Sequence, residues 1–501
     1  MPQKKNRAID IFFSAVLPDR RVPDGYTALK YSTLLILFLY FLSYLIIPFS
    51  NGDPAYYTIL GRGIIQHHLF PYNYAFDHKP LGVNLFYGLW DWLIPFYSGK
   101  FAVLALVLSA AVVCLCRTFG DFSRATAFML LTVGGAIFNV LSGNSEIVLV
   151  TGETVCLTLM FKGIQNNRNS LFFLAGIVAA FTVNINYLSA VCLVAPAALL
   201  LFSPGWFRLS RCFLAVAGGL IGLLALFSPY LLAGHGALQT YFSMQHEFLH
   251  RYSGSLHERL LCLLWMTFYV LLLSPVLIAW CRRFPLCDQM QNNRKNLILP
   301  LWFFSSLPAT MLSGHPFEHY FQLCFAPAAI MWAILLRQGV IFSRYALMPF
   351  FVVALFFVIN NARTNFKTYI HCNRVDYAAI SREVGQNKVL SLRAYHSVFY
   401  LSNLWPFDIY LFSDHTDIMY GVHAGQHFME DLQKRPPYVV MRYNACGLHE
   451  VEPQVCEWVQ QHYKLIYAVN VQQSKPNKFS VALYKLIQPV QAPATPNIAE
   501  H

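Results

Sequence analysis

The sequence predicts a mainly α-helical protein that crosses a membrane many times and ends in a small α/β domain. First, only 12% of its 501 residues are charged and 56% are hydrophobic, whereas an ordinary soluble protein has roughly 25% charged residues. So few charges could not cover the surface of a soluble protein of this size. Second, long apolar runs recur up to residue 360, and the residues after it return to ordinary polarity.

Transmembrane helices are predicted wherever an apolar run can cross about 30 Å of hydrocarbon. The apolar stretch Leu171–Phe202 is interrupted by Asn184-Ile185-Asn186, which predicts two helices in a tight hairpin. With this hairpin, about eleven spans are expected within residues 31–360, after an N-terminal segment of residues 1–30. The other nine runs are Tyr31–Phe49, Phe101–Cys116, Ala125–Leu141, Ile147–Phe161, Phe213–Leu232, Leu260–Trp280, Leu297–Leu312, Phe317–Leu336 and Tyr345–Ile359.

The segment Leu81–Tyr97 is hydrophobic but interrupted by polar residues, so it could span the membrane or lie along its surface. If it lies along the surface, the loops on the side of the N-terminus hold 18 basic residues, and the opposite loops before the last span hold five. Making it a span breaks this bias, and cytoplasmic loops are enriched in Lys and Arg. We therefore expect an interfacial helix with Asp91 at its surface, a cytoplasmic N-terminus, and outer loops at residues 50–100 and 233–258.

The net charge of +12 arises from 36 Lys and Arg against 24 Asp and Glu. In a soluble protein this excess would suggest nucleic-acid binding. Here the basic residues occupy short loops between apolar runs, where membrane topology explains them. The expected partners are therefore membrane lipids and not nucleic acid.

Residues 361–487 are predicted to form a small α/β domain on the outer, periplasmic face. The Pro-rich tail of residues 488–501 is expected to be disordered. Cys446 and Cys456 could form a disulfide in an oxidising periplasm, which the sequence alone leaves open. The predicted strands are Lys388–Ala394, Tyr438–Tyr443, Leu465–Val469 and Phe479–Leu486, and a helix is predicted at Glu457–His462.

The first outer loop carries the strongest functional signal. Asp53 follows the first span directly, at the start of a Pro-opened helix. A carboxylate in this place could act as the general base for an acceptor hydroxyl. Arg62 and Lys79 are the natural counter-charges for a phosphate. The alternative is that Asp53 caps the helix and Lys79 anchors the chain at the membrane surface.

The order of residues in this loop resembles the first periplasmic loop of GT-C glycosyltransferases. That pattern is an Asp after the first span, a helix containing Tyr56 and Tyr57, a Pro-Tyr, and a Lys-Pro that opens an interfacial helix. The similar branch holds the dolichyl-phosphate-mannose protein mannosyltransferases and the bacterial aminoarabinose transferases of lipid A. Here Lys79-Pro80-Leu81 replaces the commoner Lys-Pro-Pro, and Asp77-His78 stands where many relatives carry an acid directly before the Lys.

Two further places match this family. Asn144-Ser145-Glu146 opens the fourth span, where an acidic residue at the second outer loop is common in the family. His319-Tyr320, followed by Pro327, resembles the family's helix start. The resemblance implies contacts to donor or acceptor from Tyr56, Tyr57, Glu146, His319 and Tyr320. Two further candidates are His315, which lies four residues before His319 at an outer helix start, and Glu153, an ionisable residue within a span.

The resemblance implies transfer of a hexose or pentose from a polyprenyl-phosphate carrier, undecaprenyl phosphate in most bacteria. The acceptor would be a glycan, lipid or protein at the periplasmic face of the bacterial inner membrane, such as lipopolysaccharide, O-antigen, lipid A or another surface glycan. Asp53 would deprotonate the acceptor, and Lys79 with Arg62 would bind the lipid phosphate. A polymerase or transporter of lipid-linked glycans, without the Asp53 chemistry, is an alternative.

A competing motif lies in the outer loop at residues 233–258. His246-Glu247-Phe248-Leu249-His250 matches H-E-x-x-H, in which two His on one helix face bind zinc and the Glu activates a water. Gly254 and His257 each fall one residue too late for the extended form of this motif. The H-E-x-x-H match alone still makes a membrane zinc metalloprotease an alternative function. The resemblance implies no certain cofactor, and a divalent metal stays a candidate.

Overall fold

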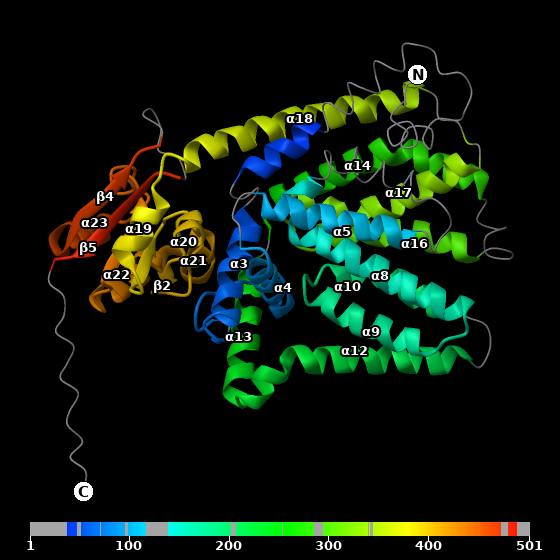
Figure 1. The fold of residues 1–501 in the computed structure, drawn as a ribbon, viewed down its shortest axis with the longest axis horizontal. Helices are drawn as coiled ribbons and strands as arrows, with labels where there is room; N and C mark the ends of the chain where they lie inside the picture. The colour runs from blue at the N-terminus through cyan, green and yellow to red at the C-terminus, as the bar shows by residue number, and fades with distance from the viewer. Residues whose placement is uncertain are drawn as a thin grey trace, which may run out of the picture.

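The computed structural model shows a bundle of helices with an α/β domain at one end (Figure 1). It describes residues 38–47, 52–70, 72–95, 99–116, 139–201, 207–252, 254–284, 294–338, 340, 344–471 and 479–487, and the structural statements below concern these residues. The N-terminal segment 1–30, the tail 488–501 and the span predicted at Ala125–Leu141, apart from its last three residues, lie outside them.

The bundle is built from apolar helices, which confirms the mainly α-helical class. Among the described residues, three helices are long and apolar enough to cross a membrane, at Ser145–Gln165, Leu209–Leu232 and Leu256–Arg283. Shorter apolar helices also contribute, so the expected total of eleven spans stays a prediction. The bundle helices are α5 (Lys100–Cys116), α8 (Ser145–Gln165), α9 (Ser170–Val183), α10 (Ser189–Cys192), α11 (Val194–Leu201), α12 (Phe207–Leu232), α14 (Leu256–Arg283), α16 (Arg294–Met311), α17 (Gln322–Arg337) and α18 (Arg344–Cys372).

The predicted hairpin is present as α9 and α10, separated by a turn at residues 184–188. The Asn184 side chain donates to the Ala180 carbonyl (3.0 Å), which closes the end of α9. The side-chain oxygen Oδ1 of Asn186 accepts a hydrogen bond from the Leu188 backbone amide (3.1 Å). These polar side chains satisfy backbone groups that the break between the helices frees.

The end of the bundle next to the α/β domain carries several short elements. They are α3 (Gly52–Ile65), α4 (Leu81–Leu93), η3 (Val140–Ser142), α13 (His235–Arg251) and η4 (Glu318–Phe321). The 13 residues of α4 are fewer than the roughly 20 that a span needs, as expected for an interfacial helix. It packs closely on α3 at Gly61 and Gly88. A Cβ atom added at Gly61 would lie only 2.4 Å from the Gly88 Cα atom.

The C-terminal domain is a five-stranded sheet with helices around it, and the four predicted strands are present. The strand order is β2-β1-β3-β5-β4, in which β1 runs parallel to β2 and β3, and β5 runs antiparallel to β3 and β4. Cys446 and Cys456 form a disulfide. The elements are α19 (Tyr377–Val384), β1 (Lys388–Leu392), α20 (Ser397–Ser402), β2 (Trp405–Pro406), α21 (Ser413–Tyr420), η5 (Gly421–His423), α22 (Ala424–Gln433), β3 (Tyr438–Arg442), α23 (Pro453–His462), β4 (Tyr463–Val469) and β5 (Val481–Leu486).

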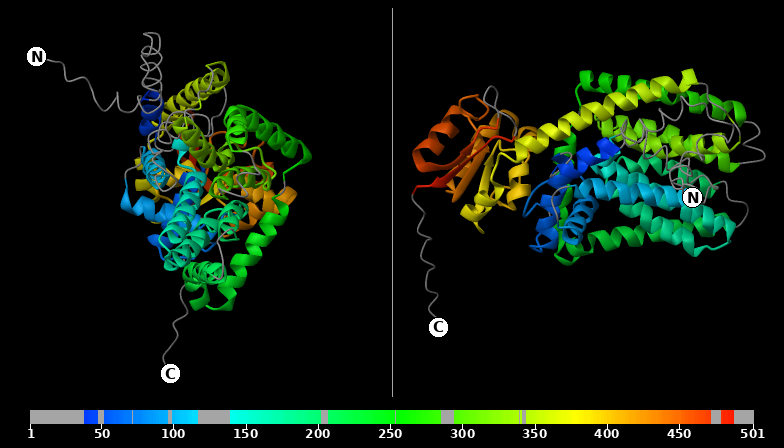
Figure 2. Two further views of the ribbon diagram at one scale, coloured as in Figure 1. Left: turned by 90° about the vertical axis from the view of Figure 1, so that its right-hand side faces the viewer. Right: turned by 45° about the horizontal axis from the view of Figure 1, so that its top comes forward.

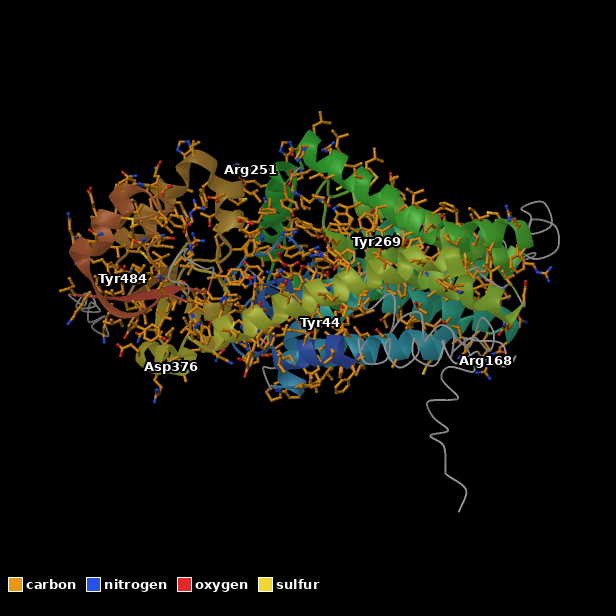
Figure 3. The ribbon with its side chains drawn as sticks, turned by 90° about the horizontal axis from the view of Figure 1, so that it is seen from above. Tyr44, Arg168, Arg251, Tyr269, Asp376 and Tyr484 are labelled. Atoms are coloured by element: carbon orange, nitrogen blue, oxygen red, sulfur yellow. A yellow bond between two sulfur atoms is a disulfide. The ribbon has the colours of Figure 1, made fainter. Side chains whose placement is uncertain are left out.

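The α/β domain is held against the first outer loop and α13. The long helix α18 runs along the bundle and leads into the domain (Figure 2). His396 bonds through its Nε2 atom to the Gly52 carbonyl (2.9 Å), and the Phe76 amide donates to the Ile409 carbonyl (2.8 Å). Figure 3 shows Arg251 beside this domain and Arg168 at the opposite end of the bundle. The two residues therefore lie at opposite ends, as their predicted outer and cytoplasmic loops require.

Candidate functional site

Asp53 lies in the first turn of α3, at the outer end of the bundle. Its side chain is half-buried, and it has no hydrogen bond to any described residue. A capping role would need a backbone amide of the first turn to donate to it, and the described amides do not. Burial raises the pKa of the Asp53 carboxyl above its ordinary value, although the nearby His319 and Lys79 charges oppose the rise. The carboxylate is thus free to accept a proton from a bound hydroxyl.

Lys79 is a buried cation close to Asp53. It is 7% exposed, and its Nζ atom lies 5.4 Å from the centroid of the Tyr320 ring. No carboxylate of the described residues lies within ion-pair distance of the ammonium. Burying a charge without a paired counter-ion is costly, so this cation is suited to bind an anion.

Glu146 and His319, from α8 and η4, close the other side of this group. Glu146 is 1% exposed, and its Oε1 atom accepts from the Asn186 amide (3.3 Å) and the Ser145 hydroxyl (3.1 Å). The His319 Nε2 atom lies 3.9 Å from Glu146 Oε2. The polar group around Asp53 therefore brings together residues from five separate segments of the chain.

The segment that carries Lys79 is fixed from α13. The amide nitrogen of Gln245 donates to the carbonyls of Asp77 (3.0 Å) and Lys79 (3.2 Å). The Tyr241 hydroxyl accepts from the Leu81 amide (3.1 Å). Both residues are buried, and the sequence analysis assigned neither of them a role. The buried face of α13 is therefore a support for the lysine segment.

Arg62 lies outside this group. Its Nε atom donates to Asp91 Oδ2 (2.8 Å) and its Nη1 atom to the Tyr400 carbonyl (2.9 Å), and Lys100 also pairs with Asp91. Asp91, predicted at the surface, is only 5% exposed. That expectation was wrong because Asp91 neutralises two buried cations. The same pairing does not fit the phosphate-binding role predicted for Arg62.

The other predicted contact residues are distributed around the site. Tyr56 donates to the Phe76 carbonyl and faces His415 of the α/β domain, with 3.5 Å between its hydroxyl and Nδ1. Tyr57 is buried, and its ring contacts Tyr87. Glu153 lies deeper in the bundle, where the Trp302 indole donates to it (2.8 Å), and His315 pairs with Glu258 (3.1 Å).

The H-E-x-x-H residues lie on the opposite, exposed face of α13. His246 and His250 are both exposed, and Glu247 pairs with Arg251 (2.8 Å). Within the described residues, two other groups have a geometry that could hold a metal: Asp77, His78 and His415, and Asp408, His427 and Asp431. In the first, burial raises the pKa of Asp77, but the hydrogen bond from His78 and the neighbouring charges hold it below its ordinary value.

Sequence reasoning missed several residues that complete the site. Gln245 and Tyr241 lie on the buried face of α13, whereas the H-E-x-x-H motif lies on its exposed face. Asn186, predicted only to interrupt an apolar stretch, also donates its side-chain amide to Glu146. His396 and His415 reach the first outer loop from the C-terminal domain, more than 300 residues away. A docking between domains leaves no local signal in the sequence.

Comparisons with known proteins give a fold. No family model matches the sequence, and no curated protein matches it. The structure is similar to that of ArnT from Cupriavidus metallidurans bound to undecaprenyl phosphate, with a TM-score of 0.56, 12% identity, and coverage of 92% of this chain and 98% of that chain. The apo form of the same ArnT gives a TM-score of 0.53 with the same identity and coverage. The chain therefore has the fold of ArnT.

Proposed function

We propose that this protein is an integral-membrane glycosyltransferase that takes a sugar from a polyprenyl-phosphate donor, undecaprenyl phosphate being the carrier. The observation that carries the proposal is the pair formed by the half-buried Asp53 carboxylate and the buried, unpaired Lys79 ammonium. A base and a phosphate-binding cation are what this transfer needs at one place. Support comes from the fold shared with ArnT, which has been crystallised with undecaprenyl phosphate.

The reaction is a displacement at the anomeric carbon of the donor sugar. Asp53 accepts the proton of the acceptor hydroxyl as its oxygen forms a bond to that carbon. The bond between the anomeric carbon and the phosphate oxygen breaks, and its electron pair stays on the departing polyprenyl phosphate. Lys79 stabilises the negative charge that grows on this leaving group. Glu146 and His319 line the place where the sugar would lie.

The acceptor, on this proposal, is lipopolysaccharide or another surface glycan at the periplasmic face of a bacterial inner membrane. The apolar bundle, with its expected eleven spans, supplies a surface for the polyprenyl tail. We assign Arg62 to the support of α4 through Asp91 and not to the donor phosphate.

The test is the replacement Asp53→Asn, assayed by mass analysis of the surface glycans. Cells without the protein should lose one sugar unit from a glycan, and the wild-type gene should restore it. The Asp53→Asn variant should restore about 10²–10⁴-fold less activity, since that is the usual contribution of a general base. Full restoration by the variant would exclude the proposed chemistry.

A matched measurement separates lost chemistry from lost fold. Burial makes the ionised Asp53 unfavourable, as its raised pKa records, so a neutral Asn should fold at least as stably at neutral pH. Purified Asp53→Asn should therefore melt no lower than the wild type and should still bind undecaprenyl phosphate. A variant that has lost both activity and stability would leave the general-base role without support.

A further inference from the structure

A second polar cluster lies in the α/β domain, outside the group around Asp53. Asp408 belongs to the loop between β2 and α21, and His427 and Asp431 are separated by one turn on α22. One ligand atom from each of the three side chains lies within 4.8 Å of the other two. Two carboxylates and one imidazole form a donor set that zinc accepts.

The two distances from His427 in this cluster match those between ligands of a tetrahedral cation. The His427 Nε2 atom lies 3.1 Å from Asp408 Oδ2 and 3.5 Å from Asp431 Oδ2. Zinc bonds of about 2.0 Å in tetrahedral geometry place neighbouring ligand atoms about 3.3 Å apart. The three donor atoms could therefore bind one ion with little movement of their side chains.

An unsatisfied oxygen points to a ligand at this place. Asp431 is 3% exposed, and its Oδ2 atom forms no hydrogen bond with a described residue. Its other oxygen accepts from Lys434 (2.6 Å). A single proton on His427 Nε2 can be donated to Asp408 at 3.1 Å and leaves Asp431 Oδ2 unsatisfied. A buried acceptor without a donor is costly, whereas a cation engages both carboxylates at once.

The surrounding residues hold the donors in place. The Tyr420 ring stacks on the His427 imidazole, with 4.0 Å between centroids and 11° between planes. The backbone amide of Ile409 donates to Asp408 (2.7 Å), and Lys434 orients Asp431. Such outer contacts fix ligand orientation in metal sites.

We propose that Asp408, His427 and Asp431 form a zinc-binding site with three protein ligands and an open fourth position. The ion would tie the loop after β2 to α22. In that loop, the Ile409 carbonyl accepts a hydrogen bond from the amide of Phe76, which lies three residues before Lys79. The ion would thus stabilise the anchor of the first outer loop on the α/β domain. The site stands independently of the transferase proposal, because no residue of it reaches Asp53 or Lys79.

The experiment is zinc binding to the purified full chain in detergent, after treatment with EDTA and dialysis. Zinc alone is added, free metal is removed, and the retained metal is quantified; affinity is then measured by competition with a chromophoric chelator. The wild type should retain zinc at this site. His427→Gln and Asp431→Asn should each weaken binding at least tenfold. Substitution with Co²⁺ should give the intense visible spectrum of a tetrahedral site in the wild type only.

Three matched variants make the test specific. His246→Gln/His250→Gln removes the H-E-x-x-H pair, and His78→Gln alters the other group with metal-binding geometry, so both should leave the affinity of this site unchanged. Lys434→Met removes the hydrogen bond that orients Asp431 and should weaken zinc binding less than the loss of a ligand does. If the cluster is only an imidazolium between two carboxylates, the wild type retains no zinc here. That result, or equal binding by His427→Gln, overturns the proposal.

Discussion

Two buried cations of the first outer loop lie in opposite electrostatic settings. Arg62 is 4% exposed and is paired with Asp91, while its Nη1 atom also donates to a backbone carbonyl. Lys79 is 7% exposed, and among the described residues it has an aromatic ring beside it but no paired carboxylate. The two cations come from the same loop, and only their partners differ.

This difference teaches which cation supports the fold and which is available for a ligand. A buried charge that the chain neutralises contributes to a defined packing of α3, α4 and α5. A buried charge that the chain leaves without a counter-ion costs stability. Proteins tolerate such a cost mainly at functional sites. The contrast therefore favours Lys79 over Arg62 for the proposed anion-binding role.

The largest expected effect breaks the neutralised cluster. Asp91→Asn removes the carboxylate between Arg62 and Lys100, which are 4% and 0% exposed. Removing one partner of a buried ion pair typically costs about 3–5 kcal/mol, so the free energy of unfolding should fall by about this amount. Thermal or denaturant unfolding of the purified protein measures it. Undecaprenyl phosphate binding, measured below the melting temperature, should stay near the wild-type value.

If Asp91→Asn instead abolishes lipid binding while the protein stays folded, Arg62 and its partners belong to the donor site. That outcome would restore the phosphate-binding role predicted for Arg62. It would also remove the distinction between the two cations.

The next effect concerns the unpaired cation. Lys79→Gln removes the positive charge but keeps a side chain of similar length, so the affinity for undecaprenyl phosphate should fall by about 10- to 100-fold. This corresponds to the 1.5–3 kcal/mol of a charge-assisted hydrogen bond. Fluorescence competition in detergent micelles provides the dissociation constant. The melting temperature should not fall, because the substitution removes an uncompensated buried charge.

A Lys79→Gln variant that binds the lipid as the wild type does would contradict this assignment. Lys79→Arg is the matched variant. It keeps the charge and should recover part of the affinity.

Much of the fold could be predicted because burial in a membrane requires a distinctive composition. The apolar runs predicted the helices, and the polar interruption at Asn184–Asn186 predicted the break between α9 and α10. Short runs in the C-terminal domain predicted β1, β3, β4 and β5. The two-residue strand β2 was missed because it is too short for any periodicity, and the helices α19 to α22 were missed because they are short, at 6 to 10 residues.

The candidate site could be proposed from the sequence where one loop carries its own signal, as at Asp53 and Lys79. It could not be predicted where chemistry depends on a distant partner. The sequence places Arg62 and Lys79 in one loop, but no local pattern indicates that Asp91 pairs with Arg62 and not with Lys79. The contact of Asn186 with Glu146 likewise joins residues 40 positions apart. Partners of this kind follow from packing alone.

A third prediction uses the opposite pKa shifts of two carboxyls. Burial raises the pKa of Asp53, whereas for Asp91 burial is outweighed by the hydrogen bond and charge of Arg62, which hold its pKa below the ordinary value. Asp53 must be ionised to act as a base, so transfer should fall about tenfold for each pH unit below its raised pKa. The contribution of Asp91 to stability is present above its unfolded pKa and is lost only as the pH falls through its lower folded pKa.

A range of mildly acidic pH should therefore exist in which the protein is folded but inactive. Initial transfer rates and melting temperatures, both measured as the pH is lowered, should decline at different pH. A common midpoint for both would show that the loss of activity reflects unfolding, and the proposed titration of Asp53 would lose its support.

The smallest expected effect concerns the support of Lys79 by α13. Gln245→Leu removes an amide that donates to the carbonyls of Asp77 and Lys79. A hydrogen bond of this kind contributes about 1 kcal/mol, so affinity for undecaprenyl phosphate should fall about fivefold. His246→Gln, next along the same helix but exposed, is the control and should bind as the wild type does.

A double variant tests whether Gln245 acts through Lys79. If Gln245 only positions the ammonium, Gln245→Leu should weaken lipid binding in the wild type but have no further effect once Lys79→Gln is present, because the two changes remove one interaction. Additive losses would mean that Gln245 affects the lipid by another route. This double-mutant cycle thus measures how far lipid binding by Lys79 depends on the support that α13 gives it.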